Sequence, residues 1–68
     1  MTASDLDIYE TARRIIEAHG GSALYLARSR LEECGDLGNL EGADDWRRII
    51  AAIEFLQAEE KPERSEVQ

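Results

Sequence analysis

Apolar residues recur at helical spacing in three segments of the chain. In the first segment they return every three or four residues, which places them on one face of a helix. Ser4 stands where an N-cap is expected, and Gly20 or Gly21 can adopt the left-handed backbone that ends many helices. The pattern predicts a helix over residues 5–18. Its buried stripe consists of Ile8, Ala12, Ile15 and Ile16.

The second segment predicts a helix over residues 22–37, with Ser22 as its candidate cap. Gly35 weakens the last turn relative to alanine. The helix therefore ends either at Cys34 or at Leu37, and the pattern does not decide between these two positions. The buried stripe consists of Leu24, Ala27, Leu31 and Cys34.

The third segment predicts a helix over residues 40–58, with Asn39 as a natural N-cap. Acidic residues follow in its first turns, where they complement the positive end of the helix dipole. The inward face consists of Trp46, Ile49, Ile50, Ile53, Leu56 and Gln57. Trp46 is expected to fill the centre of the core, because it is the largest of these side chains.

The absence of strand alternation and the short connections indicate antiparallel helices. We therefore expect an all-α protein, a small three-helix bundle over residues 1–60 in which helices 22–37 and 40–58 form a tight hairpin. Residues 61–68 lose the periodicity and include Pro62, so they are expected to be a flexible tail. The predicted core consists of Ile8, Ala12, Ile15, Leu24, Ala27, Leu31, Trp46, Ile49, Ile50 and Ile53.

The stretch CGDLGNLEGADDW, residues 34–46, combines acids and glycines as a metal-binding loop does. An EF-hand loop counted from Asp36 needs Gly at position six and Glu at position twelve, but Glu41 and Arg47 stand there. Caps and first-turn acids explain the same residues, so we expect no metal site. A looser carboxylate site is the alternative. It would use Asp36, Glu41, Asp44 and Asp45.

Glycine at position 42 has no conformational role inside an isolated helix. Its smallness instead indicates a close approach to another backbone.

Fifteen acidic and eight basic residues give the 68-residue chain a net charge of −7. Such a surface repels phosphate backbones, so nucleic-acid binding is disfavoured, whereas solubility and a basic partner are favoured. A single Cys excludes an internal disulfide, and one Cys with one His cannot supply an ordinary zinc site. No apolar run suits a membrane span, and no signal peptide is evident. A free thiol without an export signal predicts a cytoplasmic protein.

Candidate catalytic groups lack the neighbours that catalysis needs. His19 has no orienting motif, and Cys34 lies among carboxylates that disfavour a reactive thiolate. No phosphate loop or Cys-x-x-Cys motif is present. The sequence therefore predicts no catalytic residue and no cofactor, and a protein that is not an enzyme.

Two stretches carry a resemblance to a known group of proteins: DIYETARRIIEAHG at 7–20 and GNLEGADDWRRIIAAIEFLQ at 38–57. The pattern Ile-Tyr, His-Gly, Gly-(Asp/Asn)-Leu-x-Gly and Trp-x-Arg-Ile resembles a family of short bacterial helical proteins with no assigned function. The chain departs from that pattern at Gly35, where an aliphatic residue is expected. The resemblance implies an all-helical domain and no particular activity.

A second apolar surface is predicted opposite the core. At about 100° per residue, Phe55 lies on the far side of its helix from Trp46. Exposed apolar residues mark an interface where they gather in one patch. The candidate interface residues are Tyr25, Leu26, Ala51 and Phe55.

These features favour a small acidic interaction module or adaptor that binds a protein partner or itself, with a homodimer as the simplest form. A first alternative is a nucleic-acid-associated regulator that uses surface arginines from all three helices: Arg13 and Arg14, Arg28 and Arg30, Arg47 and Arg48. A second is an acidic inhibitor that mimics nucleic acid, since residues 31–46 hold six acids and no base.

Overall fold

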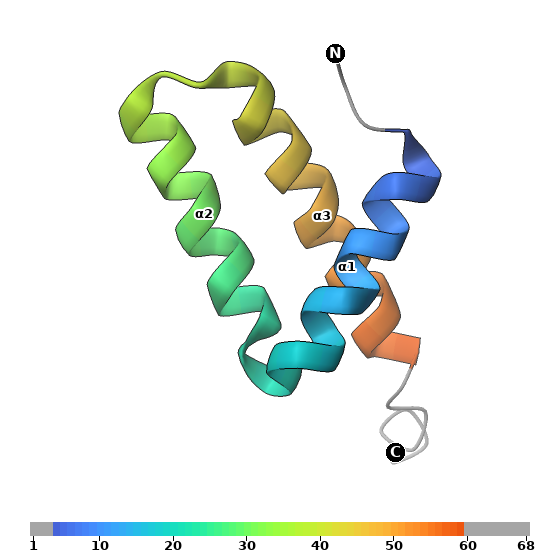
Figure 1. Ribbon diagram of the computed structural model, residues 1–68. Coiled ribbons are helices and arrows are strands. Elements are labelled where there is room, and N and C mark those ends of the chain that lie inside the picture. Colours follow the sequence, from blue (N-terminus) through green and yellow to red (C-terminus); the bar gives the residue numbers. More distant parts are fainter. Residues whose placement is uncertain (1–3, 60–68) are drawn as a thin grey trace, which may run out of the picture.

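The computed structural model describes residues 4–59, which form three α-helices and one short 3₁₀ turn (Figure 1). The elements are α1 (Asp5–His19), η1 (Gly20–Ser22), α2 (Ala23–Leu37) and α3 (Leu40–Glu59). The described part contains no β-strand, so the prediction of an all-α protein is confirmed. The predicted tail at 61–68 lies outside the described residues.

Helix α1 begins and ends close to its predicted limits. The Ser4 side chain accepts a hydrogen bond of 3.2 Å from the backbone N–H of Asp7, so the predicted cap is confirmed. The helix continues to His19, and the N–H of Gly20 donates to the carbonyl of Ile16. Gly20 has the expected positive φ of 54°, but its ψ of −122° lies outside the left-handed helical region. For the backbone of Gly20, the prediction of a positive φ is therefore correct and that of a left-handed helical conformation is wrong.

Helix α2 starts one residue later than predicted, because Ser22 belongs to η1. Ser22 makes no side-chain capping hydrogen bond, so its predicted role as N-cap is wrong. The N–H of Ala23 instead donates to the carbonyl of Gly20 within the 3₁₀ turn. The backbone of η1 thus occupies the place that a capping side chain was expected to take.

The turn between α2 and α3 resolves the uncertain end of the second helix. Gly38 follows Leu37 in the left-handed conformation, with φ 75° and ψ 20°. Its N–H donates to Gly35 at 3.2 Å, while that of Asn39 donates to Cys34 at 2.8 Å. These paired bonds form a Schellman motif, which satisfies the last carbonyls of the helix. The motif ends α2 at Leu37, so Gly35 lies inside the last turn of the helix and does not terminate it.

Asn39 caps α3 as predicted. Its Oδ1 accepts a hydrogen bond of 3.0 Å from the backbone N–H of Gly42. A Cβ at Gly42 would lie 2.6 Å from Asn39 Nδ2 and 3.0 Å from Cys34 Sγ. The predicted approach to another backbone is therefore wrong. The close neighbours are side chains, because the cap holds Asn39 against the first turn of α3.

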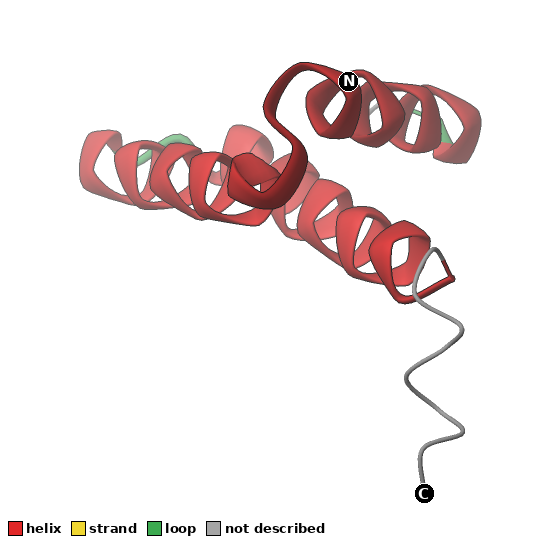
Figure 2. Cartoon of the chain, turned by 90° about the horizontal axis from the view of Figure 1, so that it is seen from below, coloured by secondary structure: helices red, strands yellow, loops and turns green. Residues whose placement is uncertain are grey.

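Helix α3 is the element that joins the fold together. It runs antiparallel to α2 and packs extensively against both α2 and α1, whereas α1 and α2 share few direct contacts (Figure 1). The turned view shows α1 on one side of the layer formed by α2 and α3 (Figure 2). A three-helix bundle is therefore not supported. The arrangement is a helical hairpin with a third helix laid on α3.

The core is built on small residues where helices meet. Predicted core residues that are buried are Ile8, Ala12, Ala27, Ile49 and Ile53. Those that are only half-buried are Ile15, Leu24, Leu31, Trp46 and Ile50. Ile53 is the largest fully buried side chain, so it takes the central place expected for Trp46, which packs at the edge of the cluster. Ala23 and Ala43 are buried as well, and the predicted core omitted both.

Candidate interaction surface

An open groove of about 620 Å³ lies between α2 and α3. Helix α2 contributes Tyr25, Arg28, Ser29, Leu31 and Glu32, and α3 contributes Arg47 and Ile50. No residue of α1 lines it. The groove therefore belongs to the hairpin alone.

Helical spacing explains how the groove is built. Tyr25, Arg28 and Glu32 are separated by three and four residues, so they share one face of α2. Leu31 and Ile50 are half-buried and form the apolar floor where the two helices meet. The floor is thus continuous with the core, while the charged side chains stand at the edges.

Charges of both signs stand at the edges of the groove. Arg28 Nη2 lies 3.8 Å from Glu54 Oε2, which links α2 to α3. Both of these side chains are more than half exposed, so the pair contributes little to stability. Glu32 on α2 and Arg47 on α3 make no ion pair with any residue of the described 4–59 segment. Their charges are available to a binding partner.

The four predicted interface residues differ in exposure and in position relative to the groove. Tyr25 is 76% exposed and lines the groove. Ala51 and Phe55 follow Arg47 by four and eight residues, so they continue its stripe along the outer face of α3. Phe55 is 55% exposed, so it is not part of the protein's own core. Leu26 is half-buried and does not line the groove.

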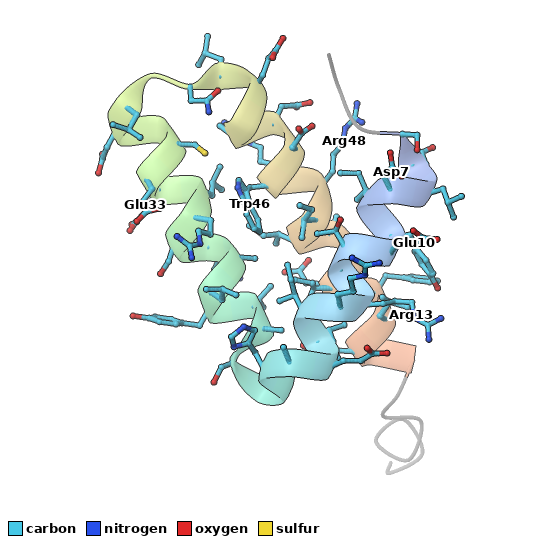
Figure 3. The ribbon with its side chains drawn as sticks, in the orientation of Figure 1. Asp7, Glu10, Arg13, Glu33, Trp46 and Arg48 are labelled. Atoms are coloured by element: carbon cyan, nitrogen blue, oxygen red, sulfur yellow. The ribbon has the colours of Figure 1, made fainter. Side chains whose placement is uncertain are left out.

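Carboxylates accompany the arginines of all three helices. Arg30 lies 3.3 Å from Glu33, and Arg48 lies 3.6 Å from Asp44, four residues earlier on α3. On α1, Arg13 and Arg14 line a second hollow together with Glu10 and Glu17. Figure 3 shows Arg13 beside Glu10 on the outer side of α1, while Glu33 projects from α2 on the other side of the molecule. The arginines are therefore distributed over surfaces of mixed charge.

The acidic turn does not gather metal ligands. Among residues 4–59, no three His, Cys, Asp or Glu side chains are placed to hold a metal ion. Asp44 is engaged with Arg48, and Asp45 buries one carboxylate oxygen without a hydrogen-bond partner in the described segment. That the turn binds no divalent metal stays a prediction.

The two candidate catalytic residues are far apart in the fold. His19 is exposed at the end of α1, whereas Cys34 is a half-buried free thiol in the last turn of α2. About fifteen residues of helical rise, at 1.5 Å each, separate the two ends of α2. The structure does not bring His19 and Cys34 into one site.

Sequence reasoning did not identify the groove edges. Arg28 and Arg47 were considered only as surface charges, and Glu32 only as part of an acidic stretch. The one available signal was their position next to the apolar stripes, which becomes informative only once α2 and α3 are paired.

No helix of the described segment is long and apolar enough to cross a membrane. No protein-family model, curated protein or solved structure matches the chain. The resemblance to short bacterial helical proteins therefore stays a prediction, and any function must be inferred from the surface itself.

Proposed function

We propose that the protein is a small, acidic, helical interaction module that binds a protein through the α2–α3 groove. The observation that carries the proposal is an exposed tyrosine above an apolar floor, between two edges that carry unpaired charges of opposite sign. Tyrosine and arginine are enriched at the centres of protein interfaces. The module acts by contact alone, in the cytoplasm, and without catalysis or a cofactor.

The small size of the domain also favours a binding partner. A domain of about 60 residues buries only about 60% of its unfolded surface and is marginally stable alone. Covering Leu31, Ile50 and Tyr25 would extend the core without changing the fold. A partner that does this stabilises the folded chain by mass action.

The two alternative functions have weaker support. Nucleic-acid binding needs a basic surface, but Arg28, Arg30 and Arg48 are each within ion-pair distance of a carboxylate. An acidic mimic of nucleic acid needs free carboxylates, but Glu33 and Asp44 are engaged with arginines of their own helices. Neither alternative accounts for the apolar floor between α2 and α3.

The test is photo-crosslinking in the cells that make the protein. A photoreactive amino acid replaces Tyr25 in the groove, and in a matched variant it replaces Glu17 on the outer face of α1. We expect a protein adduct from position 25 that is lost when Arg47→Glu is added, and none from position 17. Equal labelling from both positions, or no adduct from position 25, would show that the groove is not a binding surface.

A further inference from the structure

The charges along the groove form an alternating pattern. On the α2 edge, Arg28 is followed one turn later by Glu32. On α3, Arg47 lines the groove, and Glu54, about two turns later and outside the lining, lies level with Arg28, as their ion pair shows. Because α2 and α3 run antiparallel, Glu32 and Arg47 lie toward the same end of the groove (Figure 1). One end of the groove thus has Arg28 opposite Glu54, and the other end has Glu32 and Arg47 within about one turn of each other.

We propose that the occupant of the groove is a second copy of this chain, related to the first by a two-fold axis parallel to the α2–α3 hairpin. This inference rests on the proposed function and names its partner. A two-fold axis in that direction places α2 of each copy over α3 of the other. Glu32 of each copy then faces Arg47 of the other copy, and Arg28 faces Glu54.

A second two-fold axis brings the same faces together. An axis across the helices places α2 against α2 and α3 against α3 and exchanges the two ends of the groove, so that Glu32 faces Arg28 of the other copy and Arg47 faces Glu54. Both axes therefore bring opposite charges together. Only the parallel axis pairs Glu32 with Arg47, so only there does a mixture of chains with exchanged charges at these two positions restore the pairing.

The exposed apolar residues fit the same arrangement. Phe55 directly follows Glu54, so it lies level with the first turns of α2. In the pair it meets α2 of the second copy near Tyr25, and the two rings form an aromatic contact. Ala51 lies one turn before Phe55 and allows the second α2 to approach closely. Three of the four predicted interface residues thus belong to one self-complementary face.

Helix α1 takes no part in this contact. It lies on one side of the α2–α3 layer and contributes nothing to the groove (Figure 2). The two hairpins together form a four-helix arrangement in which facing helices are antiparallel, with an α1 on each outer side. Because the same face is used twice, the assembly closes at two copies.

Sedimentation equilibrium of the purified chain across micromolar concentrations tests the inference through a charge swap. We expect the wild type to dimerise, and Glu32→Arg or Arg47→Glu alone to weaken the dimer by at least about tenfold. An equimolar mixture of the two variants should recover dimers, because in the mixed dimer each position 32 again faces a position 47 of opposite charge. Glu17→Arg and Arg13→Glu on α1 change the net charge by the same amounts and should leave the dimer unchanged.

Each outcome supports or overturns the inference. A monomeric wild type overturns it, and so do charge variants that dimerise as well as the wild type, or a mixture that stays monomeric. Circular dichroism of each variant establishes that a lost dimer is not a lost fold. If the wild type is monomeric but position 25 still crosslinks a different protein, the interaction module stands and the second copy as its partner does not.

Discussion

The two connections between the helices are held by different means. Residues of the α2–α3 turn supply the hydrogen bonds that the adjoining helix ends need. The backbone N–H groups of Gly38 and Asn39 bind the last carbonyls of α2, and the Asn39 side chain caps the start of α3. Every one of these bonds joins residues within a few positions of each other. A turn of this kind depends on its own residues and forms wherever the two helices do.

The α1–α2 connection needs help from a distant part of the chain. Gln57 Nε2 on α3 donates a hydrogen bond of 3.0 Å to the carbonyl of Gly20, across 37 positions of the sequence. The local side chain that was expected to cap α2, Ser22, makes no such bond. The difference indicates that the hairpin is a local structure, whereas the placement of α1 depends on the completed fold.

Gly20→Ala should have the largest effect. Residues that carry a Cβ rarely adopt a backbone conformation with φ 54° and ψ −122°, so we expect a loss of about 2–3 kcal/mol in the free energy of unfolding. Urea denaturation at fixed protein concentration measures it. Gly21→Ala is the matched control, because Gly21 has no positive φ and open space around its Cβ position. Equal losses in both variants would remove the special role of Gly20.

Gly38→Ala should cost less, about 1 kcal/mol, because the left-handed conformation is strained but accessible to other residues. Gly38→Asn should be nearly tolerated, whereas Gly20→Asn should not, since asparagine tolerates the left-handed region in particular. Gly35→Ala serves as the control: it lies inside α2 with free space around it and should be neutral or stabilising. Thermal unfolding of these variants, with Gly20→Ala alongside, ranks them.

Asn39→Ala should lower the free energy of unfolding by about 1 kcal/mol, through loss of the cap on Gly42. Ser22→Ala is the corresponding change at the other connection and should stay within about 0.5 kcal/mol, since Ser22 caps nothing. The difference in the free energy of unfolding between the two variants shows how much more the α2–α3 connection depends on a local cap than the α1–α2 connection does. A Ser22 effect as large as that of Asn39 would contradict it.

Gln57→Glu should have a smaller effect than Asn39→Ala, about 0.5–1 kcal/mol in the free energy of unfolding, because it removes one hydrogen-bond donor at a partly exposed site. Faster amide hydrogen exchange in α1 and η1, with α2 and the Gly38–Asn39 turn unchanged, would show that the bond holds α1. Ala58→Glu adds the same negative charge at the neighbouring exposed position without removing the bond. If it has the same effect, charge near the end of α3 is the cause.

Much of the helical structure could be predicted because its causes are local. Ser4 and Asn39 cap the helices that follow them, as their side chains and positions indicated. Phe55, opposite the inward stripe of α3, is exposed as its angle predicted. These features depend on neighbours within one or two turns, and such neighbours are visible in the sequence.

The end of α2 and the environment of Gly42 were less visible. The sequence allowed the helix to end at Cys34 or at Leu37, and only the left-handed backbone conformation at Gly38 decided for Leu37. The close neighbours of Gly42 come from Cys34 and Asn39, on the two sides of the turn. Where two short-range signals compete, the packing of the turn decides between them.

By itself, the sequence determined which face of each helix is apolar, approximately where each helix begins, and the excess of acidic charge. Only the tertiary structure decided that Leu31 and Ile50 form the floor of a groove, that Glu32 and Arg47 stand at its edges, and that Gln57 reaches Gly20. The physical reason is that helical periodicity sets the direction of a side chain relative to its own axis. Which side chains meet depends on the rotation and register of one helix against the next, and that is settled by the packing of both helices at once.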